Sequence, residues 1–168
     1  MSDDDTYRID PARSDDAETM ADLWVDLATD QRAYGSHLDP EANRDRMVEI
    51  LLQQVVADTA FVARDGDRIV GFVTFGRESE TFEQDTVRGQ IHNIFVSEDH
   101  RGEGIGSDLL SAAEERLAAM GVDAVALQSM ATNERARAFY RRHGYTPHRI
   151  ELEKSAESDS LTKDDRQG

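Results

Sequence analysis

The stretch IHNIFVSEDHRGEGIGSDLL, residues 91–110, joins an apolar strand pattern to the first turns of a helix. Between the two elements, Gly102, Gly104 and Gly106 occupy alternate positions. The N-terminus of a helix carries unpaired N–H groups and a partial positive charge, and glycine lets an anion approach those groups without meeting a Cβ atom. The stretch therefore predicts a pyrophosphate-binding turn between a strand and a helix.

Two other phosphate-binding turns fit these residues less well. A P-loop needs a Gly-Lys-Ser/Thr sequence, and the stretch contains no lysine. A Rossmann turn places its third glycine three residues after the second, whereas Gly106 follows Gly104 after two. A glycine-rich turn that only permits close packing stays open as an alternative.

A second motif follows downstream, Asn133-x-x-Ala136-x-x-Phe139-Tyr140-x-x-x-Gly144-Tyr145. Together with Arg101-x-x-Gly104-x-Gly106, it resembles the GCN5-related N-acetyltransferase (GNAT) family, closely over residues 91–145 and more loosely over 7–75. The resemblance implies an α+β (mixed α/β) fold of the GNAT type. Its central sheet would be mostly antiparallel, splayed between the fourth and fifth strands, with helices on both faces.

The order of the predicted elements agrees with that fold class. In the first half of the chain, periodicity, capping residues and turn signals predict a short strand at 7–9, helices beginning at Ser14 and near Pro40, and a hairpin of 59–64 with 69–75. In the second half, the same signals predict a strand at 90–96, a helix from Gly104 to Gly121 and a strand at 123–130. A helix from Asn133 to Gly144 and a final strand at 145–153 complete the predicted order. We expect one domain over 7–154, between disordered acidic tails at 1–6 and 155–168.

By resemblance, acetyl-CoA would be the cofactor, and its residues would come from both motifs. The pyrophosphate would lie against the turn formed by Arg101, Gly102, Glu103, Gly104, Ile105, Gly106 and Ser107. The backbone of Phe95 and Val96 would pair with the pantetheine arm, with a Val96 N–H facing the thioester oxygen. Asn133 and Ala136 would lie beside that arm. Arg142 would contact the nucleotide phosphates, unless it pairs with surface carboxylates.

Two side chains are candidates for proton transfer. Tyr140 would protonate the leaving thiolate, since a phenol can donate a proton and helical spacing puts it on the same face as Ala136. His92 would take the proton of the amine, although a structural role, Glu83 or a water wire stay open. We expect the acceptor to be bound by Tyr34, His37, Asn93 and Gln128. Gln128 stands where some protein-acetylating relatives carry a glutamate. The histidines show no metal-ligand spacing, so no metal is predicted.

The composition restricts the partners. The formal net charge is −16, from 35 acidic and 19 basic residues, and the only lysines are Lys154 and Lys163. Such a surface repels nucleic acid and anionic membranes. It resembles proteins of halophilic archaea, although an Arg-for-Lys bias also follows from nucleotide content. The chain has no cysteine, which fits a reducing cytoplasm.

These observations predict an N-acetyltransferase that moves an acetyl group from acetyl-CoA to a primary amine by direct attack in a ternary complex. The expected acceptor is a small molecule. Acetylation of protein N-termini is one alternative, and a non-catalytic acyl-CoA-binding regulatory domain is another. A homodimer is left open, as are the identity of the amine and the use of longer acyl-CoA molecules.

Overall fold

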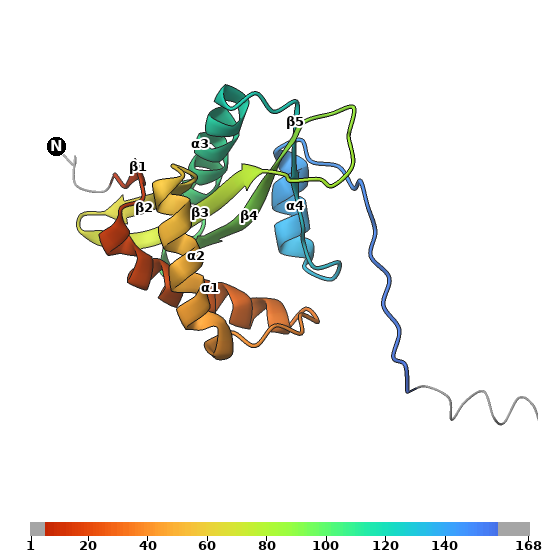
Figure 1. The fold of residues 1–168 in the computed structure, drawn as a ribbon. Helices are drawn as coiled ribbons and strands as arrows, with labels where there is room; N and C mark the ends of the chain where they lie inside the picture. The colour runs from red at the N-terminus through yellow and green to blue at the C-terminus, as the bar shows by residue number, and fades with distance from the viewer. Residues whose placement is uncertain (1–5, 158–168) are drawn as a thin grey trace, which may run out of the picture.

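The computed structural model describes residues 6–157. Within this range the chain forms one five-stranded sheet, in the order β1-β2-β3-β4-β5, and four α-helices (Figure 1). The strands are β1 (Arg8–Pro11), β2 (Ala60–Asp65), β3 (Arg68–Arg77), β4 (Arg88–Val96) and β5 (Ala124–Leu127). Of the two predicted tails, only Thr6 and residues 155–157 lie within the described range.

Helices cover both faces of the sheet, as predicted. They are α1 (Ala17–Arg32), α2 (Arg44–Val56), α3 (Ile105–Ala119) and α4 (Glu134–Arg142). On one face, α1 and α2 bury Met20, Trp24 and Leu51 against Val62 and Phe72. On the other face, α3 buries a leucine-rich stripe against the opposite side chains of β3 and β4, and Phe139 of α4 packs at its margin. Alternate side chains of β3 therefore point to opposite faces of the sheet and pack into two separate hydrophobic cores.

The four strand pairings give a mostly antiparallel sheet. Strands β1 to β4 pair antiparallel, and β4 pairs with β5 in parallel. The parallel contact extends only over Arg88–Ile91 of β4, opposite β5. Beyond Ile91 the two strands separate, so β4 keeps β3 as its neighbour and has an open edge on the other side. This is the splay that the fold class predicts.

One buried ion pair ties the first helix to the sheet. Arg64 of β2 donates to Asp16 Oδ1 over 3.0 Å, and the N–H of Arg13 donates to Asp16 Oδ2 over 2.8 Å. Burial raises the pKa of the Asp16 carboxyl, but these two donors outweigh burial and hold the pKa below its ordinary value. A 3₁₀ turn at Ser14–Asp16 precedes α1, and its last residue, Asp16, is the N-cap residue of that helix.

The prediction of a final strand at 145–153 is wrong. Residues 146–154 are extended but belong to no sheet, and they run along the side of the molecule after α4 (Figure 1). A strand is stabilised by backbone hydrogen bonds to a neighbour, and the local pattern of alternating apolar residues cannot supply that neighbour.

Candidate active site

The glycine turn before α3 has a left-handed backbone. Gly102 has φ +83° and Gly104 has φ +88°, and Gly104 is the N-cap residue of α3. A Cβ atom at Gly102 would meet nothing within 4 Å, so the backbone conformation is what favours glycine there. The N–H groups of the first turn of α3 have no partner within the helix and point out of its end. We call residues 102–106 and these N–H groups the glycine cradle; that the cradle binds a pyrophosphate stays a prediction.

Gly106 has a different structural role. A Cβ atom at this position would lie 3.4 Å from the Phe139 ring, which makes Gly106 the contact point between α3 and α4. Next to it, His143 lies 2.8 Å from the Phe139 carbonyl through Nδ1 and 2.9 Å from Ser107 Oγ through Nε2. Since a carbonyl only accepts, Nδ1 carries the proton, and in the neutral ring the Ser107 hydroxyl donates to Nε2. The contact of Gly106 with Phe139 and the hydrogen bond between His143 and Ser107 therefore hold α4 against the start of α3.

The predicted cofactor residue Arg101 is bound to its own loop. Its Nε donates to the Val96 carbonyl over 3.1 Å, and its guanidinium lies 5.5 Å from the centre of the Phe95 ring. A third contact, 3.4 Å to Asp30, reaches α1. Arg101 thus closes the loop between β4 and the cradle, and a phosphate would have to compete with these three contacts.

The open edge of β4 begins at a β-bulge. Thr74 of β3 lies opposite Asn93, while Phe75 lies opposite Ile91, so His92 has no partner on β3. Bulges redirect a side chain out of the regular alternation and are frequent beside active sites. From this bulge to Val96, the β4 backbone faces the gap that the splay leaves. The predicted residues Phe95 and Val96 therefore lie where an extended arm would find an unpaired strand.

The His92 ring lines a hollow of about 360 Å³ beside the sheet. Its other lining residues are Gln53, Gln54, Ala57, Thr59, Phe75, Gly76, Arg77 and Met120. The His92 side chain is exposed at the edge of this hollow, and the protein around it still lowers its pKa below the ordinary value of 6.5, because partial desolvation disfavours the charged ring. The imidazole is therefore neutral at neutral pH, as a proton acceptor must be.

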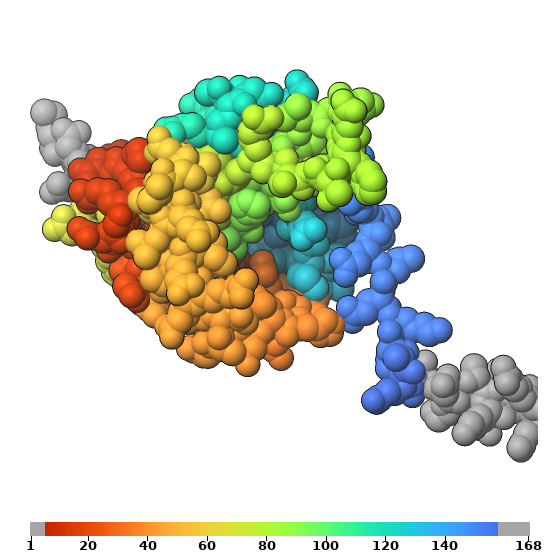
Figure 2. All heavy atoms as spheres, viewed as in Figure 1, coloured from red at the N-terminus to blue at the C-terminus, as the bar shows by residue number. Residues whose placement is uncertain are grey.

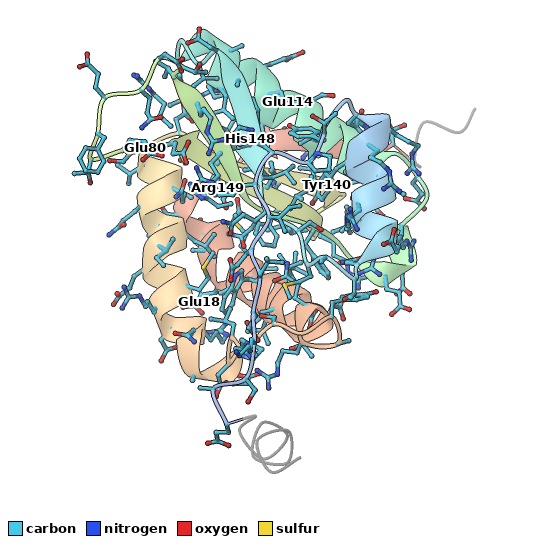
Figure 3. The ribbon with its side chains drawn as sticks, turned by 90° about the vertical axis from the view of Figure 1, so that its right-hand side faces the viewer. Glu18, Glu80, Glu114, Tyr140, His148 and Arg149 are labelled. Atoms are coloured by element: carbon cyan, nitrogen blue, oxygen red, sulfur yellow. The ribbon has the colours of Figure 1, made fainter. Side chains whose placement is uncertain are left out.

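Tyr140 is half-buried on α4 and faces the interior of the molecule (Figure 3). Its ring makes edge contacts with Phe139, at 5.3 Å between centroids, and with Tyr145, at 6.0 Å. Burial raises the pKa of Tyr140 to about 12. The phenol keeps its proton at neutral pH, and no hydrogen bond to a residue within 6–157 occupies it. No described contact joins it to His92.

Asn133 caps α4, as the sequence predicts. Its Oδ1 accepts the N–H of Ala136 over 3.1 Å, which commits the side-chain oxygen to the helix and leaves the amide N–H groups for another partner. Arg142 is exposed and lies 6.0 Å from the Phe139 ring centre through its guanidinium carbon. Because the Asn133 amide N–H groups stay available, Asn133 can cap α4 and also contact a cofactor.

The four predicted acceptor residues are not gathered into one pocket. The Tyr34 carbonyl accepts the Thr132 hydroxyl over 3.2 Å, which brings the end of α1 against the loop before α4. His37 lies 2.8 Å from Glu153 of the C-terminal segment. Asn93 donates to Thr74 across the strands over 3.0 Å. Gln128 is exposed directly after β5. Figure 2 shows the face recessed between the α1–α2 connection, β4 and α4.

Sequence reasoning missed three residues of this region. Tyr7 donates to Asp108 in the first turn of α3, and its oxygen lies 3.6 Å from where a Cβ of Gly104 would stand. His143 holds Ser107, and Arg77 lines the hollow beside His92. These contacts join elements far apart in the chain, and no local pattern signals them.

Over residues 6–157, no group of three or more side chains has the arrangement of a metal site. In the same range, no helix is long and apolar enough to cross a membrane.

Comparisons with known sequences find a family and several related proteins. The chain matches the Acetyltransferase (GNAT) family over residues 20–145. A mycothiol acetyltransferase of Clavibacter michiganensis subsp. michiganensis is 34% identical over 140 residues, covering 79% of this chain and 42% of that protein. An L-2,4-diaminobutyric acid acetyltransferase of Shouchella clausii is 33% identical over 125 residues, covering 74% and 63%. The N-alpha-acetyltransferase 30 of Schizosaccharomyces pombe is 31% identical over 86 residues, covering 51% and 56%. The chain thus spans about half the length of these relatives.

Solved structures show the same fold. A GCN5-related N-acetyltransferase from Ralstonia eutropha has a TM-score of 0.72 at 24% identity, over 90% of this chain and 99% of that one. An aminoglycoside N-acetyltransferase in complex with CoA has a TM-score of 0.70 at 14% identity, over 93% and 99%. At such identities the likeness concerns the fold alone. The family model, in contrast, matches well over half of the sequence, and the chain therefore belongs to the GNAT family of acetyltransferases.

Proposed function

We propose that this protein transfers the acetyl group of acetyl-CoA to a primary amine on a small molecule, by direct attack in a ternary complex. One observation carries the proposal: the unpaired edge of β4 runs from the His92 bulge to the glycine cradle at the start of α3. This is a continuous path for a ligand with an extended amide-containing arm and a pyrophosphate end.

The residues along this path fit acetyl-CoA. The N–H groups after Gly104 would hold the pyrophosphate, and the open backbone at Phe95 and Val96 would bond the arm as a neighbouring strand does. The amide of Asn133 would reach the same arm from α4. Acetyl-CoA would supply the acetyl group as an activated thioester, and the chain supplies orientation and proton transfer.

Two protonation states support the catalytic roles. Desolvation keeps His92 neutral and Tyr140 protonated at neutral pH, so the imidazole can accept the proton that the amine loses, directly or through water. Tyr140 can then donate a proton to the sulfur as the C–S bond breaks and the C–N bond forms. The proton count balances, because one proton leaves the amine and one joins the thiolate.

The acceptor class is inferred from the relatives and from the hollow beside His92. Relatives named for mycothiol and for L-2,4-diaminobutyric acid favour a small amine, whereas the fission-yeast relative favours a protein N-terminus. The hollow beside His92 is lined by side-chain amides and by Arg77, which suits a small polar acceptor. A binding domain without catalysis is the remaining alternative.

We further propose that the protein works in the cytoplasm of a cell rich in salt; the charge of −16 supports the high salt, and a chain without cysteine is compatible with a reducing compartment.

A release assay separates these proposals. Thiol release from acetyl-CoA is measured at molar salt with a panel of small amines and with peptides that carry free N-termini. Release with small amines supports the proposal, and release with peptides alone assigns the N-terminal activity. Calorimetric binding of acetyl-CoA without release from any amine in the panel would overturn the catalytic proposal in favour of a binding domain.

A further inference from the structure

The hollow beside His92 differs in charge from the rest of the molecule. Of the 168 residues in the chain, 35 are acidic, yet none of the described residues that line this hollow is acidic. Its polar lining consists of the cation Arg77, the amides Gln53 and Gln54, the hydroxyl of Thr59 and the imidazole of His92. The hollow is therefore a locally basic site, rich in hydrogen-bond donors, in a chain of formal net charge −16.

The carboxylates nearest to this hollow along the chain are held by other arginines. Glu78 follows Arg77 directly, and its two oxygens accept hydrogen bonds from Arg88 over 2.5 and 2.8 Å. Asp58 stands between two lining residues, and its carboxylate lies 2.7 Å from Arg116. Within residues 6–157, the exposed side chain of Arg77 forms no hydrogen bond or ion pair. The Arg77 guanidinium is therefore available to a ligand.

Arg77 also offers a backbone donor. In an antiparallel sheet, the N–H groups of alternate residues in a strand face the same neighbouring strand. The N–H of Phe75 donates to the Thr59 carbonyl over 3.1 Å, on the side of β2. The N–H of Arg77 faces this side too, but the pairing of β2 with β3 ends at Ala60 and Thr74, and no residue within 6–157 accepts this N–H. Arg77 thus brings both an unpaired N–H and an unpaired guanidinium to the rim of the hollow.

These donors suit a carboxylate on a small molecule. A guanidinium binds a carboxylate through two parallel hydrogen bonds, and a backbone N–H can add a third. The hollow has a volume of about 360 Å³, at the lower end of the range for ligand pockets. The charge of −16 repels polyanions, whereas a molecule with one carboxylate and one ammonium group carries no net charge. An amino acid meets all three conditions.

The imidazole of His92 lies between this hollow and the open edge of β4. A Cβ atom at Gly76 would stand 3.5 Å from His92 Nε2, so the ring reaches over β3 at the residue next to Arg77. His92 also occupies the bulge at which the open β4 edge begins. A small acceptor bound at Arg77 through its carboxylate would therefore extend along the His92 ring, with its amine directed toward the path proposed for acetyl-CoA.

We propose that the acceptor is a small amine that also carries a carboxylate, and that Arg77 binds this carboxylate while the amine lies beside His92. The inference rests on the proposed acetyl transfer and names the class of its substrate. Arg77 is a specificity-determining residue in this arrangement and takes no part in proton transfer. Its contribution should therefore appear in KM more than in kcat.

Matched pairs of amines test the requirement for a carboxylate. The members of each pair differ by the carboxylate alone: β-alanine with ethylamine, ornithine with putrescine, and lysine with cadaverine. Thiol release from acetyl-CoA is measured at the lowest sodium chloride concentration that keeps the chain folded, because salt screens an exposed ion pair. In the pairs that the wild type acetylates, kcat/KM should be about tenfold higher or more for the member with the carboxylate, mainly through a lower KM.

A pair of arginine variants assigns the preference to a residue. Arg77→Gln removes the cation with little change in side-chain length and should abolish the preference for the carboxylate. Arg68→Gln changes the net charge equally, at the exposed start of the same strand, and should keep the preference. Melts followed by circular dichroism check that both variants are folded. A preference that survives Arg77→Gln, or that Arg68→Gln removes to the same degree, would overturn the assignment.

A binding measurement separates this inference from the proposed transfer. Lysine and cadaverine are titrated calorimetrically into the wild type and into Arg77→Gln, in the presence of CoA. Tighter binding of lysine that Arg77→Gln abolishes, without thiol release from any amine, would support the carboxylate site and overturn the transfer. Thiol release with equal KM for both members of every pair would support the transfer and overturn the carboxylate site.

Discussion

At the scale of single residues, desolvation moves two candidate catalytic groups in opposite directions. It raises the pKa of the Tyr140 phenol to about 12 and lowers the pKa of the His92 imidazole. The cause is the same, since desolvation disfavours whichever form is charged. At neutral pH both groups are therefore uncharged, one with a proton to give and one without.

Removing the Tyr140 hydroxyl tests its role as the acid. Tyr140→Phe keeps the ring contacts with Phe139 and Tyr145, so the fold and acetyl-CoA affinity should be preserved. Turnover should fall roughly ten- to a thousandfold, the usual range for loss of an acid catalyst. Thiol release with a confirmed acceptor measures the rate, and calorimetry checks the affinity. Wild-type turnover in this variant would show that Tyr140 only packs.

The pH profile tests His92 as the base. Its imidazole must be unprotonated to work, so kcat/KM should rise with pH through the pKa of His92, which desolvation sets below 6.5. Tyr140 loses its proton only near 12, so it should cause no decline between neutral pH and about 10. His92→Gln should lower the rate and remove the acidic limb. An acidic limb that persists in this variant would assign the base to another group, with Glu83 the next to test.

At the scale of elements, the start of α3 depends on a left-handed turn. Gly104 has φ +88° at the cradle, and Gly121 has φ +85° after the end of the same helix. A side chain at either glycine would be strained to a similar degree, by about 1 kcal/mol. Only Gly104 lies where an anion would approach the helix N-terminus. The two glycines therefore form a matched pair for experiment.

Gly104→Ala should weaken acetyl-CoA binding by about tenfold or more, because the added Cβ stands between the phosphate and the N–H groups. Gly121→Ala should lower the melting temperature to a similar extent and leave the affinity unchanged. Calorimetry and thermal melts measure the two effects. Equal affinities in the two variants would remove the cradle from the binding site.

Local sequence patterns predicted most helices and strands. They failed where a segment needs a neighbouring strand from elsewhere in the chain to become part of a sheet. Asn133 caps α4 and the Asp65-Gly66-Asp67 turn closes the hairpin, because each signal acts within a few residues. The strand expected at 145–153 has the right alternation, but no other strand among residues 6–157 pairs with it.

The same distinction applies to the candidate site. The glycine-rich turn before a helix follows from the motif alone, whereas the positive φ angles of Gly102 and Gly104 are seen only in the structure. The bulge at His92 depends on the register between β3 and β4, and the contact of His143 with Ser107 depends on how α4 docks. Register and docking are set by tertiary packing, which the sequence pattern does not encode locally.

At the scale of the whole molecule, the excess of acidic side chains is the feature that most affects stability. With 35 acidic and 19 basic residues, the chain repels itself at low ionic strength. Ion pairs such as Arg88 with Glu78 and Arg44 with Glu18 and Asp22 offset part of this repulsion. Salt ions would screen the repulsion that remains between the unpaired carboxylates.

The melting temperature should therefore rise as sodium chloride increases from dilute to molar, with much of the gain below about 1 M, where the screening length falls to about 3 Å. Thermal melts followed by circular dichroism measure the effect. Sucrose at equal osmolality stabilises through exclusion but screens no charge, so it should raise the melting temperature less. A melting temperature that responds equally to both solutes would mean that repulsion is not the main source of the salt effect.

The distribution of lysine has a practical consequence. The chain has two lysines, and the one within the described residues is Lys154, the last residue of the extended segment 146–154. A chain of this composition presents few primary amines of its own to a thioester such as acetyl-CoA. Self-modification would therefore add little background to an acetylation assay, and an amine-reactive dye on Lys154 would lie outside the sheet and the helices.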